Sequence, residues 1–134
     1  MKNLLIKIGI KSRKASSYRI DEKKKNKILE NYFQMIEKNK LKKIKENQKD
    51  LKIAKNKGIK NNIAQRLLLN EKKISDIINS IKEIIKLKDP TNIILEKWKR
   101  PNGLIISKVS IPIGVSGVIY ESRPNVTADV ASLC

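Results

Sequence analysis

The feature that most constrains the fold of this chain is the apolar run of residues 111–120, IPIGVSGVIY, which contains no charged side chain. A strand with one face in water alternates apolar and polar residues, whereas a strand covered on both faces does not. Pro112 stands at the beginning of the run, where a missing backbone N–H is tolerated. The run therefore predicts a buried strand of a parallel α/β sheet, which requires other strands beside it and helices on both faces.

The sequence before this run has a helical pattern and contains no proline until Asp89-Pro90, which ends the helical part. Asp21 and Asn70 are suited to cap helices, and Gly58 is suited to end one. The helix after Asn70 is expected to carry an apolar stripe of six isoleucines: Ile74, Ile77, Ile78, Ile81, Ile84 and Ile85. An earlier helix carries a second apolar face: Ile28, Leu29, Tyr32, Phe33 and Ile36. Such stripes require a partner surface within the protein, because burying each side chain contributes about 1.5–3 kcal/mol.

Two short β-prone runs, residues 92–99 and 104–110, flank the pair Asn102-Gly103, which is a strong signal for a β-hairpin. After the apolar run, residues 121–127 (ESRPNVT) are expected to form a loop at the carboxyl end of the buried strand. We expect the next helix to start at Thr127 or Asp129. Ligands of open α/β sheets bind beyond strand carboxyl ends and at helix starts, so this loop is the candidate site.

The net charge of +18 raises the question of a nucleic-acid partner. Residues 1–60 carry +14 of it, but the basic residues are 26 lysines and only 5 arginines, and aromatic residues make up 4%. Base recognition relies on the arginine fork and on aromatic stacking, both scarce here. The composition therefore favours a lysine-coated surface, and a lysine-rich nucleic-acid-binding module remains the alternative.

The chain has no histidine and one cysteine, so it offers neither a zinc ligand set nor a histidine-activated nucleophile, and we expect no metal. No apolar stretch approaches the 18 or so residues of a membrane span, and we expect no membrane partner. The start of the chain lacks the cleavage site of a signal peptide, which favours the cytoplasm.

Residues 100–104 (RPNGL) and 112–129 (PIGVSGVIYESRPNVTAD) resemble the glutamate-5-semialdehyde dehydrogenase (gamma-glutamyl phosphate reductase) family, within the aldehyde dehydrogenase superfamily. The stretch Tyr120–Thr127 is the specific part of the match. The resemblance implies an α/β fold, with N-terminal helices followed by a β-hairpin and the first strand of an incomplete aldehyde-dehydrogenase-like nucleotide-binding domain. Residues 1–89 would form the N-terminal helical part of the cofactor domain. Residues 90–134 would supply the hairpin, the first nucleotide-binding strand and the start of the following helix.

Members of this family use NADPH to reduce L-glutamate 5-phosphate to L-glutamate 5-semialdehyde in proline biosynthesis. In the implied mechanism a cysteine thiolate displaces phosphate, and hydride from the nicotinamide reduces the resulting thioester. The family's members are much longer than this chain, so the resemblance implies an N-terminal fragment that lacks the nucleophilic cysteine and the catalytic domain. Such a fragment would be inactive alone, and the full-length protein would be a homo-oligomer. A non-functional remnant that does not fold stably is a third interpretation.

By the same resemblance, the backbone around Tyr120, Glu121 and Ser122 lines the nicotinamide side of the cofactor site. Asn125 is the candidate donor to the developing oxyanion, with a loop-structuring asparagine as the alternative.

Arg123 would hold an acidic group of the substrate through its planar guanidinium. The alternative for Arg123 is a structural ion pair with Glu121 or Asp129. Cys134 is interpreted as a small buried residue of the helix and not as the nucleophile, because no histidine is present to activate its thiol.

Overall fold

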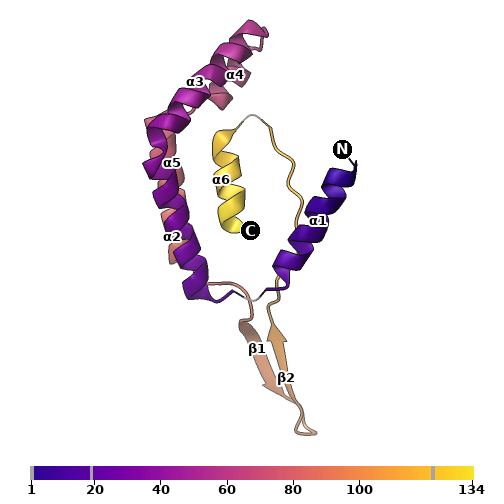
Figure 1. The fold of residues 1–134 in the computed structure, drawn as a ribbon. Coiled ribbons are helices and arrows are strands. Elements are labelled where there is room, and N and C mark those ends of the chain that lie inside the picture. Colours follow the sequence, from indigo (N-terminus) through magenta and orange to yellow (C-terminus); the bar gives the residue numbers. More distant parts are fainter. Residues whose placement is uncertain (1, 19, 122) are drawn as a thin grey trace. The chain divides into compact units, whose positions relative to one another are not determined.

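The structure is a computed structural model that describes residues 2–18, 20–121 and 123–134. These residues form six helices and one two-stranded antiparallel sheet (Figure 1). In chain order the elements are α1 (Lys2–Ser16), α2 (Glu22–Lys38), α3 (Lys40–Asn56), α4 (Asn61–Leu67), α5 (Glu71–Lys86), β1 (Ile94–Lys99), β2 (Ile105–Val109) and α6 (Pro124–Leu133). The chain divides into two compact units, of which one holds α1 and the hairpin and the other holds α2–α6.

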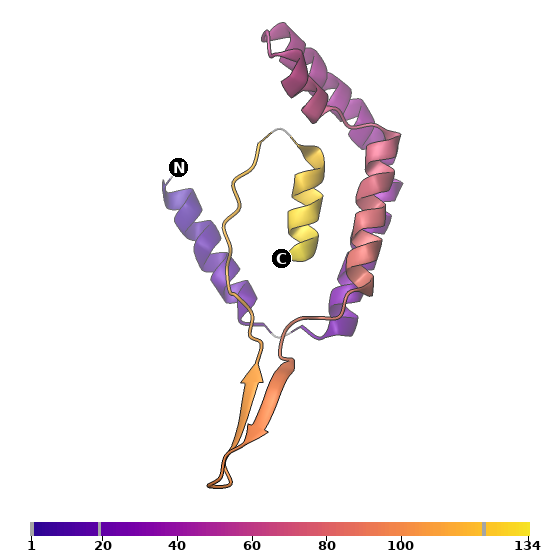
Figure 2. The same ribbon diagram turned by 180° about the vertical axis from the view of Figure 1, so that it is seen from behind.

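Helix α5 is the centre of the helical unit. Figures 1 and 2 show α2 running along it, and α5 also packs against α6. Ile74 and Ile81 are 1% and 0% exposed, and Ile77 and Ile78 are also buried. Two further side chains complete the core, Ile36 from α2 and Ala128 from α6. The predicted isoleucine stripe is therefore confirmed, with its last two members only half-buried.

The predicted face of α2 is confirmed except at one position. Leu29, Tyr32 and Phe33 pack against the core, whereas Ile28 is 50% exposed. At 100° per residue, Ile28 lies at the edge of the apolar stripe, which explains its exposure.

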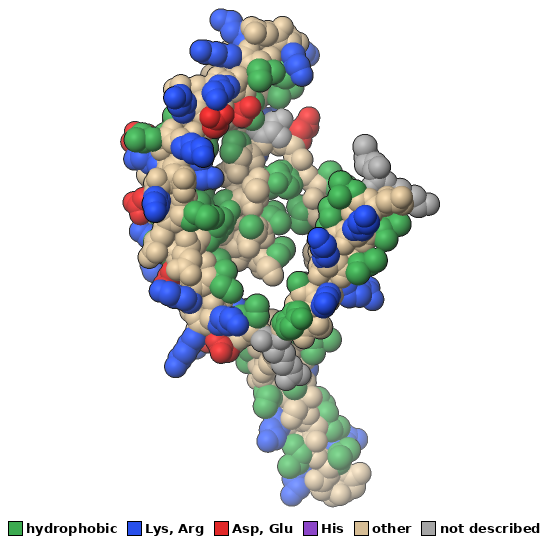
Figure 3. All heavy atoms as spheres, viewed as in Figure 1, with side chains coloured by type: hydrophobic (Ala, Val, Ile, Leu, Met, Phe, Trp, Pro, Cys, Tyr) green, Lys and Arg blue, Asp and Glu red, His purple; other side chains and the backbone are tan. Residues whose placement is uncertain are grey.

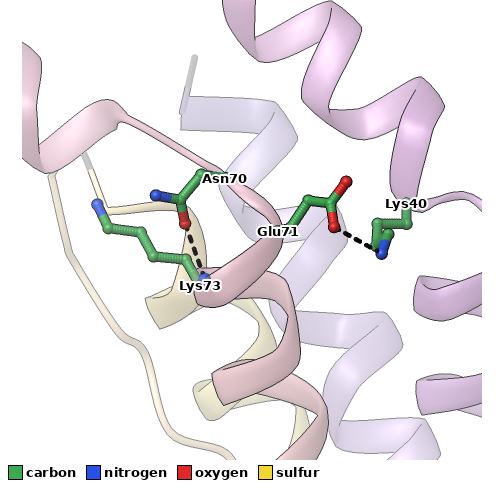
Figure 4. Close-up of polar contacts among 4 residues, drawn as sticks. All are labelled: Lys40, Asn70, Glu71 and Lys73. Carbon is green, nitrogen blue, oxygen red and sulfur yellow. Dashed lines mark hydrogen bonds and ion pairs between the residues drawn. The ribbon is translucent and has the colours of Figure 1, made fainter.

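Both predicted helix caps are present. The Asn70 carboxamide oxygen accepts from the Lys73 backbone N–H at 2.9 Å, and the Asp21 carboxylate accepts from the Lys24 backbone N–H at 2.7 Å. Beside the first cap, Lys40 forms an ion pair with Glu71 at 3.1 Å (Figure 4). This pair lies at the surface and contributes little to stability. Each cap satisfies a backbone donor that the first turn of a helix would otherwise leave unpaired.

Helix α3 ends where predicted, since Gly58 adopts a left-handed φ of +66° just beyond it. The segment after α4 is held to α3 by Asn47, which is 6% exposed. The Asn47 side-chain amide donates to the Leu67 carbonyl at 2.9 Å, and its oxygen accepts from the Leu69 backbone N–H at 2.7 Å. One buried side chain thus satisfies two backbone groups that leave the regular pattern.

The predicted β-hairpin is confirmed. Strand β1 pairs antiparallel with β2, and Gly103 in the connection has a φ of +87°. The turn is closed by the Arg100 backbone N–H, which donates to the Leu104 carbonyl at 2.8 Å. A left-handed residue is what this turn requires, and glycine adopts that conformation without a steric penalty.

Two expectations for the last part of the chain are corrected. Residues 111–121 form neither helix nor strand, and Ile113 and Ile119 are fully exposed, because none of the described strands pairs with this segment. Helix α6 begins at Pro124 and not at Thr127 or Asp129. Proline has the backbone φ of a first helical residue, and its missing N–H leaves no bond unmade at that position.

Candidate functional site

The candidate residues lie on the segment that enters α6 and on the first turn of that helix. Ser122 lies outside the described residues. The Tyr120 hydroxyl and the Thr127 Oγ1 are 2.8 Å apart and form a hydrogen bond across the loop. The structure therefore brings the two ends of the predicted loop together.

Asn125 has a specific partner within α6. Its Nδ2 donates to Oδ2 of Asp129 at 3.2 Å, one helical turn further on. A carboxylate can only accept, so this contact directs the NH₂ side of the amide toward Asp129 and occupies one of its two N–H groups. A second negative charge about 5 Å from the carboxylate would be opposed by about 3 kcal/mol at an effective dielectric of 20. The contact orders the first turn of α6 and leaves the second N–H of the amide for a ligand, so it is compatible with both interpretations of Asn125.

Arg123 is the residue before α6, with an extended backbone and an exposed side chain. Among the described residues, no carboxylate lies within ion-pair distance of its guanidinium, so the pairing with Glu121 or Asp129 is not formed. The guanidinium is positively charged and the N-terminus of a helix carries a partial positive charge, so this position favours the binding of an anion.

Tyr32 of α2 lies near Tyr120 and Asp129. From the sequence it was predicted only to belong to the apolar face of its helix. Burial, and then the nearby Asp129 and Tyr120, raise the pKa of its hydroxyl above the ordinary value. The only sequence signal was the residue type, since tyrosine on an apolar face combines a packed ring with a polar tip.

Cys134 was expected to be buried, but it is exposed. It is the C-cap of α6, where the packing of that helix no longer covers it. Ten helical residues separate it from the loop, which corresponds to about 15 Å at 1.5 Å per residue. Its thiol cannot reach a substrate held at the loop.

A groove of about 530 Å³ lies beside the first turn of α6. Apolar residues of α2, α5 and α6 line one part of the groove, and charged residues of α3 line another. The charged residues of α3 in this lining are Lys42, Lys43, Glu46 and Asp50. Figure 3 shows lysine and arginine side chains spread over α2 and α3, in keeping with the predicted lysine-coated surface.

Within the part of the chain that the structure describes, no group of three or more His, Cys, Asp or Glu side chains could hold a metal ion. No buried side-chain nitrogen or oxygen of these residues lacks a hydrogen-bond partner. None of the described helices is both long and apolar enough to cross a bilayer.

The raised pKa of Tyr32 predicts a loss of stability in alkaline solution. The unfolded chain releases the Tyr32 proton near the ordinary pKa of 10.0, whereas the folded chain keeps it to higher pH. Stability is therefore fully present below that value and is lost as the pH rises above it. Between about pH 9 and about pH 11, the urea midpoint should fall less for Tyr32→Phe than for the unchanged chain. The exposed Tyr18→Phe is the matched control, and an equal fall in all three proteins would contradict the prediction.

No protein-family model matches the sequence. Curated relatives do match, and all those described here are named gamma-glutamyl phosphate reductase. The protein from Dictyoglomus turgidum is 46% identical over 136 residues, covering 99% of this chain and 32% of the relative. The protein from Clostridium tetani is 40% identical over 132 residues, covering 97% of this chain and 31% of the relative.

Two solved structures of gamma-glutamyl phosphate reductase match the fold. The Thermotoga maritima crystal structure has a TM-score of 0.91 at 34% identity and covers 96% of this chain and 32% of that one. The Saccharomyces cerevisiae structure has a TM-score of 0.89 at 29% identity and covers 95% of this chain and 33% of that one. The chain thus spans about a third of the length of the relatives that it matches. In sequence and in fold, the chain belongs to the gamma-glutamyl phosphate reductase family and corresponds to the amino-terminal third of its members.

Proposed function

We propose that this chain is the part of a reductase that holds one side of the cofactor site, in the conversion of L-glutamate 5-phosphate to L-glutamate 5-semialdehyde with NADPH. The observation that carries the proposal is the agreement of sequence and fold over at least 95% of the chain with proteins named for this reaction. The remaining two thirds of such a reductase would supply the nucleophilic cysteine. The complete protein would be a cytoplasmic homo-oligomer.

The loop before α6 is the proposed cofactor contact, through the backbone around Tyr120, Glu121 and Ser122. A backbone contact is consistent with the described geometry, because the Tyr120 hydroxyl is already bonded to Thr127. The nicotinamide would supply the hydride when it is bound, and these residues would orient it.

Arg123 is the proposed contact for an acidic group of the substrate, its carboxylate or its phosphate. Its guanidinium is exposed and makes no ion pair among the described residues, so binding an anion would cost no existing contact. Asn125 is the proposed oxyanion donor through the N–H that Asp129 does not occupy. Because Asp129 opposes negative charge there, the contribution of Asn125 should be smaller than the roughly 3–4 kcal/mol of an unopposed donor.

A chimeric enzyme tests the proposal. Residues 1–134 replace the matching third of the Dictyoglomus turgidum relative, and NADPH oxidation is followed with L-glutamate 5-phosphate. We expect activity, and we expect Arg123→Gln to raise the KM for the substrate by about tenfold or more, since a charged hydrogen bond contributes about 1.5–3 kcal/mol.

The matched control is Arg66→Gln, which removes an exposed arginine from the last turn of α4 and should leave KM unchanged. A chimera that folds and assembles but oxidises no NADPH would contradict the proposed function. Equal effects of the two arginine substitutions would remove Arg123 from the site.

A further inference from the structure

The hydrogen bond between Tyr120 and Thr127 closes the loop that carries the proposed cofactor contacts. The two oxygens are 2.8 Å apart and their residues are seven positions apart. Inside this span, the Val126 N–H donates to the Arg123 carbonyl at 3.2 Å, which shapes only the start of α6. The side chains of Glu121 and Arg123 make no hydrogen bond with any other described residue. Among the described residues, the Tyr120–Thr127 contact is therefore the one that joins the entering segment to the helix.

Both partners of this bond are placed by the helical unit. Thr127 lies in the first turns of α6, next to Ala128, which is 5% exposed and belongs to the core. Tyr120 lies close enough to Tyr32 of α2 to raise the pKa of that residue. The bond thus connects the segment that enters α6 to the packed surface of the helical unit.

We propose that the Tyr120–Thr127 hydrogen bond holds the backbone of Tyr120 and Glu121 in the conformation in which it contacts the nicotinamide cofactor. The Tyr120 side chain and Thr127 are then positioning residues for cofactor binding. This inference rests on the proposed function. Ordering a loop costs conformational entropy, and a bond formed before the cofactor arrives removes part of that cost from the binding step.

The chimeric reductase provides the test, with Thr127→Val as the main variant. Valine keeps the shape of threonine but has no hydroxyl, and Thr127→Ser is the matched control because it keeps the Oγ. We expect Thr127→Val and Tyr120→Phe each to raise the KM for NADPH about three- to tenfold, as for the loss of one hydrogen bond. We expect kcat within about twofold of the unchanged chimera and Thr127→Ser close to it.

The double variant shows whether the two residues act through one bond. If they do, Thr127→Val combined with Tyr120→Phe has the KM of either single variant, because the bond is lost only once. If the double variant raises the KM for NADPH by the product of the two single effects, the inference is overturned. An unchanged KM for NADPH in both single variants would also overturn it. A rise confined to the KM of L-glutamate 5-phosphate would also overturn it.

A second measurement does not require activity. In the 134-residue chain, a glutamate-specific protease cuts after Glu121, and the products are followed by mass spectrometry. Cleavage at this bond should be several times faster in Thr127→Val than in Thr127→Ser, because the open loop fits a protease more readily. Equal rates would overturn the inference, even if the chimera proved inactive and the proposed function had failed on its own.

Discussion

Replacing Ile81 with alanine is expected to lower the free energy of unfolding of the helical unit by about 2–5 kcal/mol. Ile81 is 0% exposed and lies on α5, which packs against both α2 and α6. Truncation removes apolar surface from the core and leaves a cavity that the surrounding helices can fill only in part. Urea unfolding of the chain, followed by helical circular dichroism, measures the change as a lower midpoint with an unchanged slope.

The same substitution at an exposed isoleucine is the control. Ile119 is fully exposed, so Ile119→Ala should change the free energy of unfolding by no more than about 0.5 kcal/mol. Equal losses in the two variants would show that α5 is not the centre of the folded unit. A gradual transition in the unchanged chain would contradict cooperative packing of the helices and would favour the interpretation as a remnant that does not fold stably.

Replacing Asn47 with alanine is expected to cost about 2–6 kcal/mol, since two backbone groups lose their partner and each unpaired buried group costs about 1–3 kcal/mol. The substitution leaves the Leu67 carbonyl and the Leu69 N–H without their partner. Asn47→Asp separates the two contributions. Aspartate still accepts from Leu69 but cannot donate to Leu67 when ionised, and it adds a negative charge at a position that is 6% exposed. We expect both variants to be destabilised, and Asn47→Asp to recover stability at acidic pH, where the carboxyl group is protonated.

Asn31→Ala provides the baseline for this series. Asn31 is an exposed residue of α2, so its replacement reports only the higher helix propensity of alanine, worth a few tenths of a kcal/mol. The difference between Asn47→Ala and Asn31→Ala is then the cost of the lost hydrogen bonds. A difference below about 0.5 kcal/mol would show that water replaces the side chain at both backbone groups.

Several elements could be predicted because their signals are local. A cap depends on a side chain and a backbone N–H three residues away, as at Asp21 and Asn70. The isoleucine stripe of α5 is a periodicity within one helix, and the hairpin turn requires a residue such as Gly103 that tolerates a left-handed backbone. The family also followed from a contiguous stretch, residues 112–129, and the comparisons confirm it.

Other features depended on residues far apart in the sequence. The role of Asn47 requires the segment after α4, about 20 positions later, to end beside α3. Nothing in the residues around Tyr32 indicates that Asp129 and Tyr120 lie next to it. The start of α6 at Pro124 does have a local signal, because proline is favoured at the first position of a helix. This signal was overlooked because residues 121–127 were expected to form a loop.

The order of residues alone determined which segments form helices, where those helices are capped, where the hairpin turns and to which family the chain belongs. Each of these depends on neighbours within a few positions or on a continuous motif. Only the tertiary structure decided which backbone groups Asn47 satisfies and that Thr127 forms a hydrogen bond with Tyr120. It also decided that residues 111–121 form no strand, because the hydrogen bonds of a strand belong to a pair of segments and not to one of them.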